Sequence, residues 1–311
     1  KMKSRTWSDP GQAGFVGQAH APFSPNAGGP ANLVLKDITT AKLSARQSLL
    51  LQLDQLKREV GSSGALDGMD AYYQQAFGIL TSSRLAEALE RELEDPALRD
   101  RYGRGSGEPA GYGDAGPLLN DYFLAARRLV EAGVEIVATE FDGPLCARVS
   151  NWDDHAVNHH IFEAIGHRAP YFDQAISALI EDIYQRGLDR RVLVVVTGEF
   201  GRTPRISYVA SSGGGVASRP KGPKQPGRDH WPRANSMLFA GGGIRTGQVI
   251  GATDARGEDP IDRRVDPHDF LATIYRHLGI DFRHTALSNF AGRPIPILSK
   301  GEPIPELKGE S

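Results

Sequence analysis

The feature that most constrains this fold is a continuous apolar stretch that ends abruptly in charge. Residues 191–197 contain five apolar side chains in a row, mostly β-branched, which predicts a strand buried on both faces. The stretch ends at Gly198, and Glu199 and Arg202 follow directly. Ligands of open α/β sheets bind beyond the carboxyl ends of strands, so we expect these two side chains at a functional edge. The alternative is an ordinary strand exit with an ion pair.

Helices and strands alternate over the second half of the chain. Helical spacing of apolar residues predicts helices over 117–132, 170–186 and 266–278, and short apolar stretches predict strands over 134–141 and 236–240. A right-handed helical crossover would make strand 134–141 a parallel neighbour of strand 191–197. The alternation predicts an α/β fold in which helices cover the faces of one sheet.

The first part of the chain has a different character. Its residues predict an extended surface segment over 1–42, helices over 44–60, 70–81 and 83–93, and a turn-rich excursion over 95–116. A Gly, Ser and Pro-rich loop is expected later, over 211–227. We therefore expect a helical and extended segment, 1–116, packed on an α/β core, 117–311, as one domain.

Composition limits the classes of partner. The formal charge of −2 over 311 residues gives no electrostatic reason to expect nucleic acid or an anionic membrane. No apolar run approaches the roughly 18 residues that a transmembrane helix needs. Cys146 is the single cysteine, which excludes disulfides and cysteine metal clusters within one chain. The opening residues Lys1 to Ser4 do not resemble a natural start, so we expect a longer precursor that carried any export signal.

Two further polar clusters are expected near the strand ends. Residues 151–160 hold two carboxylates and three histidines, and residues 227–232 read Gly-Arg-Asp-His-Trp-Pro. Carboxylate and neutral imidazole are ligands that Zn²⁺ and similar ions prefer. The alternatives are a polar surface loop at 151–160 and an Arg/Asp pair beside a half-buried Trp231 at 227–232. Convergence of the clusters on one sheet edge would favour a functional pocket.

Several long motifs together carry a family resemblance. They lie at 152–155, 172–182, 198–204, 227–232 and 240–251. Over essentially the whole chain the sequence resembles a bacterial domain-of-unknown-function family, the one numbered fifteen-oh-one, a remote branch of the alkaline-phosphatase and sulfatase superfamily. The resemblance implies an alkaline-phosphatase-like central mixed sheet flanked by helices, a divalent metal site at the strand ends, and hydrolysis of phosphate or sulfate esters. It also implies an extracytoplasmic location, periplasmic or secreted.

The sequence departs from the superfamily pattern in two respects. Glu199 and Phe200 stand where phosphatases and sulfatases usually have an Asp-His pair, so His155 or His230 would have to supply that imidazole ligand. The amino-terminal strand that carries the nucleophile has no counterpart before residue 117. We therefore expect a fold that lacks this strand, with an apolar sheet edge that the rest of the precursor, a second copy of the chain or another protein covers.

The preferred hypothesis is a metal-dependent hydrolase of phosphate or sulfate esters. The ion would be divalent, zinc or calcium, and its substrate a small anionic ester or a sulfated or phosphorylated glycan. The expected metal ligands are Asp153, His155, Glu199 and His230, and the expected anion-binding residues are Arg202 and Arg228. The competing hypothesis is a non-catalytic surface or carbohydrate-binding protein with a degenerate site, because a fold does not guarantee activity.

Overall fold

The computed structural model describes residues 14–16, 20, 22–23, 42, 45, 48, 82–104, 120–139, 141, 152–213, 219–289 and 291–309. The chain divides into two compact units, residues 1–90 with 284–297 and residues 91–283 with 298–311. Most of the predicted extended segment 1–42, nearly all of the predicted helix 44–60 and the whole of the predicted helix 70–81 lie outside the described residues, as does Cys146.

The described elements of the first unit are the 3-10 helix Gly14–Val16, one short α-helix and one hairpin. Helix α3, Ser83–Leu89, begins where the Ser82 side chain accepts a hydrogen bond from the Leu85 amide at 3.2 Å. Strands β9, Ala286–Ser288, and β10, Pro294–Pro296, pair antiparallel. The Asn289 side chain accepts from two amides of the connecting turn, which closes the hairpin.

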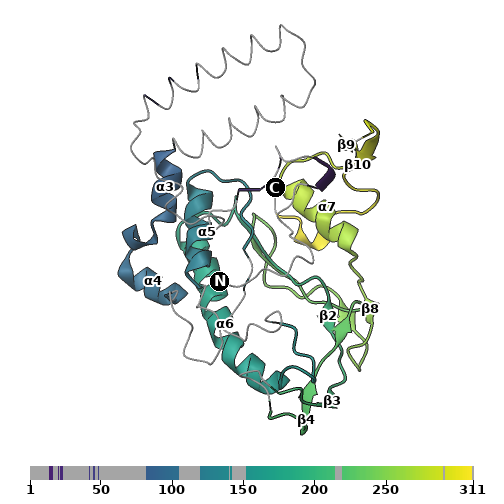
Figure 1. The fold of residues 1–311 in the computed structure, drawn as a ribbon. Coiled ribbons are helices and arrows are strands. Elements are labelled where there is room, and N and C mark those ends of the chain that lie inside the picture. The colour runs from purple at the N-terminus through teal and green to yellow at the C-terminus, as the bar shows by residue number, and fades with distance from the viewer. Residues whose placement is uncertain are drawn as a thin grey trace. The chain divides into compact units, whose positions relative to one another are not determined.

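The second unit is built around a group of three helices (Figure 1). Helices α4, Pro96–Tyr102, α5, Asp121–Glu131, and α6, Ile161–Gln185, pack on one another. The buried core between them includes Tyr102, Leu124 and Ile183. Short 3-10 helices, Arg91–Leu93 and Pro305–Leu307, also belong to this unit. The predicted helix 117–132 is therefore present as α5, and the predicted helix 83–93 is present as α3 followed by a 3-10 turn.

Charged side chains join the three helices. We call Glu94, Tyr102, Arg127, Glu131, Asp182 and Arg186 the helix network. Asp182 accepts from Tyr102 at 2.9 Å, from Arg127 at 2.8 Å and from Arg186 at 2.6 Å. Arg127 also pairs with Glu131 at 2.5 Å and with Glu94. Because Arg127 and Asp182 are buried, these contacts replace the hydration that both charges lose on folding.

Two prolines show why helix boundaries differ from the prediction. Pro96, expected in a turn-rich excursion, instead opens α4, because the Asp95 side chain accepts from the Ala97 amide at 2.8 Å and proline suits the first helical turn. Pro170, expected to open a helix, instead lies inside α6, which begins at Ile161. The predicted helix 170–186 is thus correct in type but nine residues short at its start, as the bounds show.

Helix α7, Pro267–His277, matches its predicted bounds closely. The Asp266 side chain accepts from the amides of His268 and Asp269, and the Asp269 side chain accepts from the Asp266 amide, which forms a capping box. Gly279 follows the helix with φ of 70°, a conformation that glycine adopts without strain.

The sheets are small and antiparallel. Strand β1, Leu193–Val196, pairs with β6, Leu238–Gly241, so the predicted strands 191–197 and 236–240 are neighbours. The other pairs are β2, Gly201–Arg202, with β5, His230–Trp231; β3, Ser207–Ala210, with β4, Lys224–Gly227; and β7, Ala252–Thr253, with β8, Pro260–Asp262. The described residues therefore combine helices with small antiparallel sheets, which is an α/β structure in the broad sense. They show no alkaline-phosphatase-like central sheet.

The predicted strand 134–141 is wrong for the residues described there. Residues 134–139 and 141 are in neither helix nor strand, so they supply no parallel neighbour for β1. The apolar stretch is not buried as a core strand would be, since Ile136 is 67% exposed. The expectation that strand 191–197 is buried on both faces is also wrong, because Val194 is buried but its neighbours in β1 are only half-buried.

The predicted loop 211–227 is shorter than expected. Residues 224–227 form β4, and Gln225 is fully buried there, although the composition of the segment suggested irregular structure. Residues 214–218 lie outside the described part of the chain.

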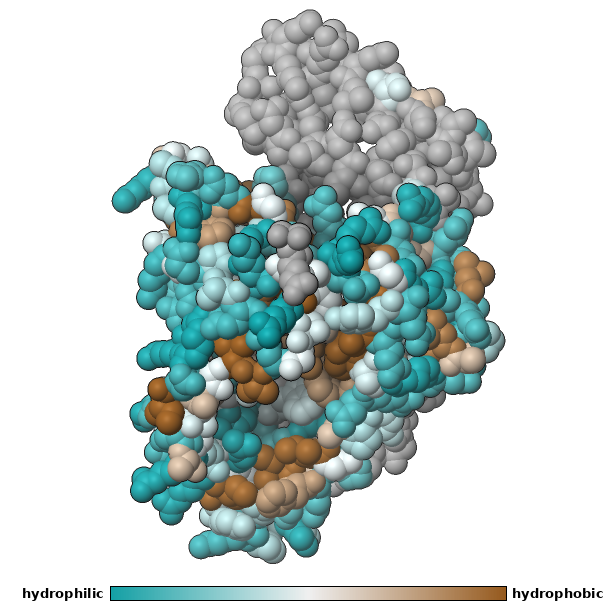
Figure 2. Space-filling view, turned by 180° about the vertical axis from the view of Figure 1, so that it is seen from behind, coloured by the Kyte–Doolittle hydropathy of each residue, from teal (hydrophilic) through white to brown (hydrophobic). Residues whose placement is uncertain are grey.

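The surface is mixed in character. Figure 2 shows hydrophobic residues in separate patches among hydrophilic ones on the face turned toward the viewer. Single apolar side chains such as Val249 and Ile261 are strongly exposed, which is common on soluble surfaces. No helix within the described ranges has the length and apolar character needed to cross a membrane.

Candidate metal centre

The two-residue ladder between β2 and β5 brings two sequence motifs together. Gly201 pairs with Trp231 and Arg202 pairs with His230, so the motif at 198–204 lies directly against the motif at 227–232. A Cβ atom on Gly201 would lie 1.9 Å from the Ala234 carbonyl oxygen. Glycine is therefore needed for this close approach of the two backbones.

The turn that begins at Asp153 packs on the end of β4. The Arg228 amide donates to the Asp154 carbonyl at 2.9 Å, and the Gln225 side chain donates to the Ala156 carbonyl at 2.7 Å. A Cβ atom on Gly227 would lie 2.0 Å from the Ala156 nitrogen, so only glycine leaves room for this turn. The motif at 152–155 is therefore held against the motif at 227–232 by one backbone hydrogen bond and by close packing on Gly227.

Trp152 anchors the other side of the turn. Its indole Nε1 donates to the Phe141 carbonyl at 3.0 Å, and its ring lies 5.7 Å from the ring of Phe172 on α6. The guanidinium carbon of Arg168, also on α6, lies 4.7 Å from the Trp152 ring centroid. The turn is thus fixed between α6 and β4, which positions the residues that follow Trp152.

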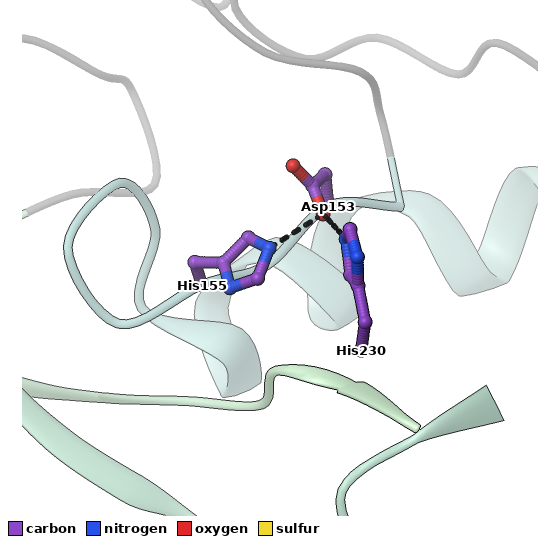
Figure 3. Close-up of side chains that lie close together, drawn as sticks. All are labelled: Asp153, His155 and His230. Carbon is purple, nitrogen blue, oxygen red and sulfur yellow. Dashed lines mark hydrogen bonds and ion pairs between the residues drawn. The ribbon is translucent and has the colours of Figure 1, made fainter. Parts of the chain in front are cut away.

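One carboxylate and two imidazoles converge at this point (Figure 3). We call Asp153, His155 and His230 the histidine cluster. Their ligand atoms all lie within 4.8 Å of one another. Asp153 Oδ1 lies 2.9 Å from His155 Nε2 and 2.9 Å from His230 Nε2, and the two ring centroids are 4.8 Å apart. Three of the four side chains that were expected at a common point therefore lie together.

The charges around Asp153 keep it ionised. Burial alone would raise its pKa, but hydrogen bonds from His230 and Arg202, together with nearby positive charge, hold the pKa of Asp153 below its ordinary value. Arg202 Nη1 donates to Asp153 Oδ1 at 2.8 Å. The side chain of Asp153 is 25% exposed, so this carboxylate is both charged and open to a ligand from solvent.

Arg228, which the sequence placed among the anion-binding residues, contacts the backbone beside the cluster. Its Nε donates to the Thr203 carbonyl at 2.5 Å and its Nη2 donates to the Arg202 carbonyl at 2.9 Å. Burial, followed by the charge of Arg202, lowers the pKa of Arg228 below its ordinary value. The guanidinium therefore clamps the backbone of 202–203 and adds positive charge beside Arg202.

Glu199 does not join the histidine cluster. Its side chain is exposed, and it is not among the residues whose ligand atoms converge. Its neighbour Phe200 does reach the cluster, with its ring centroid 4.3 Å from that of His230. The predicted parallel arrangement, which would have brought Glu199 to the same sheet edge as Asp153, is absent because the described residues of 134–141 form no strand beside β1.

Two acidic residues have roles that sequence reasoning missed. Asp229 Oδ1 lies 2.8 Å from His155 Nδ1, although the motif suggested only an Arg/Asp pair. Asp154 is buried, with its Oδ1 3.2 Å from His159 Nδ1, and it pairs with Arg168. Adjacent carboxylates thus serve opposite sides of one turn: Asp153 belongs to the cluster and Asp154 to the interior. The Asp-Asp sequence alone does not show which of the two carboxylates joins the cluster and which is buried.

The match to known families covers almost the whole chain. The family described as "Protein of unknown function (DUF1501)" matches residues 2–307. No curated protein and no solved structure matches the chain.

Proposed function

The chain belongs to the DUF1501 family of proteins of unknown function, and we propose that it is a metal-dependent hydrolase of phosphate or sulfate esters. The observation that carries this proposal is the convergence of the Asp153, His155 and His230 ligand atoms within 4.8 Å. Two imidazoles and one carboxylate are a donor set that suits catalytic Zn²⁺, which keeps a further position for water or substrate. Calcium prefers six or more oxygen ligands, so the donors favour zinc over calcium.

In this proposal, different residues bind the metal ion and the anionic substrate. A divalent ion held there would polarise an ester oxygen and lower the pKa of a coordinated water. Asp153 supplies a charged ligand, and His155 and His230 supply neutral ones. Arg202, which contacts Asp153 through one nitrogen, has further N–H donors with which to bind the oxygens of an anionic ester.

Thr203 is poorly placed to serve as the nucleophile. Its hydroxyl donates to the Arg205 carbonyl at 3.0 Å and accepts from the Asp229 amide at 3.1 Å. These two bonds hold the hydroxyl to the backbone of the turn. We therefore favour an attacking water over Thr203 in hydrolysis by this chain.

A second candidate function is ligand binding without catalysis, by a surface or carbohydrate-binding protein with a degenerate site. The observation that favours it is the crowding of Asp153 Oδ1, which has Arg202, His155 and His230 within 2.9 Å. With three nitrogen partners, this oxygen is satisfied electrostatically by the protein itself.

Metal content and turnover separate the two candidates. We expect the purified protein to retain about one equivalent of zinc per chain and to hydrolyse an aryl phosphate or aryl sulfate. His230→Ala should lose both properties, and His284→Ala, an exposed histidine outside the cluster, should keep them. Zinc without turnover would support the binding protein. Absence of bound zinc, even after incubation with the ion, would overturn the hydrolase.

A further inference from the structure

His155 lies between two carboxylates, one at each ring nitrogen. Its Nε2 lies 2.9 Å from Asp153 Oδ1, and its Nδ1 lies 2.8 Å from Asp229 Oδ1. Asp153 is a member of the histidine cluster, whereas Asp229 stands on the far side of the His155 ring from that contact. The two aspartates therefore have different relations to a metal ion at the cluster.

A metal ligand needs a free lone pair on the nitrogen that faces the ion. A neutral imidazole carries a single proton, so His155 can offer Nε2 only when the proton is on Nδ1. Asp229 Oδ1 accepts a hydrogen bond from Nδ1 at this distance and favours that tautomer. We propose that Asp229 is a positioning residue that fixes the tautomer and ring orientation of His155 for metal binding, an inference that rests on the function proposed above.

The backbone of Asp229 is held firmly enough for this role. Its amide donates to Thr203 Oγ1 at 3.1 Å, and its carbonyl accepts from the Thr203 amide at 2.9 Å. Arg228 donates from its side chain to the carbonyls of Thr203 and Arg202. These four hydrogen bonds hold residues 228–229 against residues 202–203. The backbone that carries the Asp229 carboxylate is therefore fixed beside His155.

His230 is oriented by different means. Its ring packs on Phe200, with centroids 4.3 Å apart, and its Nε2 contacts Asp153. Among the described residues, its Nδ1 has no carboxylate partner comparable to Asp229. Removing Asp229 should therefore affect one imidazole ligand and leave the other in place. Loss of such an outer partner typically weakens metal affinity about 10–100-fold, which is less than the loss of a ligand itself.

Cobalt titration tests the inference in the full chain. Co²⁺ alone is added to the metal-free protein, and its visible absorption reports both affinity and ligand geometry. We expect Asp229→Ala to bind Co²⁺ about 10–100-fold more weakly, with a changed absorption spectrum, and Asp229→Glu to recover part of the affinity. Asp229→Asn, which keeps the shape of the side chain, should fall between Ala and wild type. Asp262→Ala removes an exposed carboxylate on β8 and should match wild type.

A second measurement reads the tautomer directly. Nitrogen-15 NMR of the zinc-loaded protein should show the proton of His155 on Nδ1, and Asp229→Ala should weaken the hydrogen-bond signature of that proton. Equal Co²⁺ affinity and spectra in wild type and the Asp229 variants would overturn the positioning role and leave the hydrolase standing. A wild-type protein that binds neither Co²⁺ nor Zn²⁺ would overturn both.

Discussion

The helix network and the histidine cluster are both built from carboxylates and nitrogen donors, yet they differ in burial and in how the donors are shared. In the helix network, both oxygens of Asp182 accept hydrogen bonds, and the side chain of Arg127 is 1% exposed. In the histidine cluster, the bonds of Asp153 fall on Oδ1, and the side chain of His230 is 51% exposed.

This difference separates a structural group from one that suits a ligand. Buried charges must be paired within the protein, because water cannot replace a lost partner. A half-exposed imidazole can give up a contact within the protein and bind a ligand instead at little cost in free energy. We therefore expect substitutions in the helix network to change stability, and substitutions in the histidine cluster to change metal binding.

The largest effect should follow from Arg127→Ala. This change removes one of the two arginines that pair with Asp182, Glu94 and Glu131, the other being Arg186, and Asp182 lies in the protein interior. Breaking one side of a buried ion pair costs about 3–5 kcal/mol, so the free energy of unfolding in urea should fall by about that amount. Arg233→Ala, which breaks the exposed pair with Asp259, should cost less than about 1 kcal/mol. Equal losses in the two variants would contradict the structural role of the network.

A smaller loss is expected from Gly227→Ala. The added Cβ would lie 2.0 Å from the Ala156 nitrogen, so the turn that carries Asp153 and His155 must move away from β4. Overpacking of this kind costs about 1–3 kcal/mol, and metal binding should weaken with it. Gly166→Ala in α6 meets nothing within 4 Å and should leave zinc affinity unchanged. Zinc titration and urea unfolding of both variants would reveal whether the turn position matters.

Local signals predicted the elements that local chemistry determines. Helical spacing of apolar residues predicted α7, whose ends the Asp266 capping box and Gly279 determine, and β-branched residues predicted β1. Convergence of Asp153, His155 and His230 was also predicted, although the reason given for it, parallel strands, is wrong. The contacts that produce it include the hydrogen bond from the Arg228 amide to the Asp154 carbonyl and the one from the Gln225 side chain to the Ala156 carbonyl, and local sequence patterns specify neither.

Where prediction failed, a nonlocal contact decides the structure. Ile136 has the pattern of a strand residue but remains exposed, and Pro170 has the pattern of a helix start but lies inside α6. Glu199 was grouped with the metal ligands because strand 191–197 was expected in a parallel sheet. That parallel sheet is absent because the described residues of 134–141 form no strand, which the residues around Glu199 do not specify.

We expect the contribution of the helix network to the free energy of unfolding to be complete at neutral pH and to fall in acid. Burial alone would raise the pKa of Glu94, but hydrogen bonds from Arg127 and Arg128 hold it at about 2. A depressed folded pKa stabilises the native state fully above the ordinary value of 4.5, and this contribution is lost as the pH falls toward 2. Glu94→Gln should therefore flatten the fall in unfolding free energy between these pH values. An unchanged pH profile in the variant would assign the acid sensitivity to other carboxylates.

The smallest effect on stability should come from Asp153→Asn, which gives the sharpest contrast between the two groups. Asparagine keeps the size of the side chain and one acceptor oxygen, and the site is open to water, so the free energy of unfolding should change by less than about 1 kcal/mol. Zinc binding should nevertheless be lost or greatly weakened, because the site then lacks its charged ligand. Urea unfolding of the metal-free protein and zinc titration of the same samples measure the two quantities independently. A loss of stability comparable to that of Arg127→Ala would show that Asp153 is a structural residue like Asp182, and the distinction between the helix network and the histidine cluster would no longer hold.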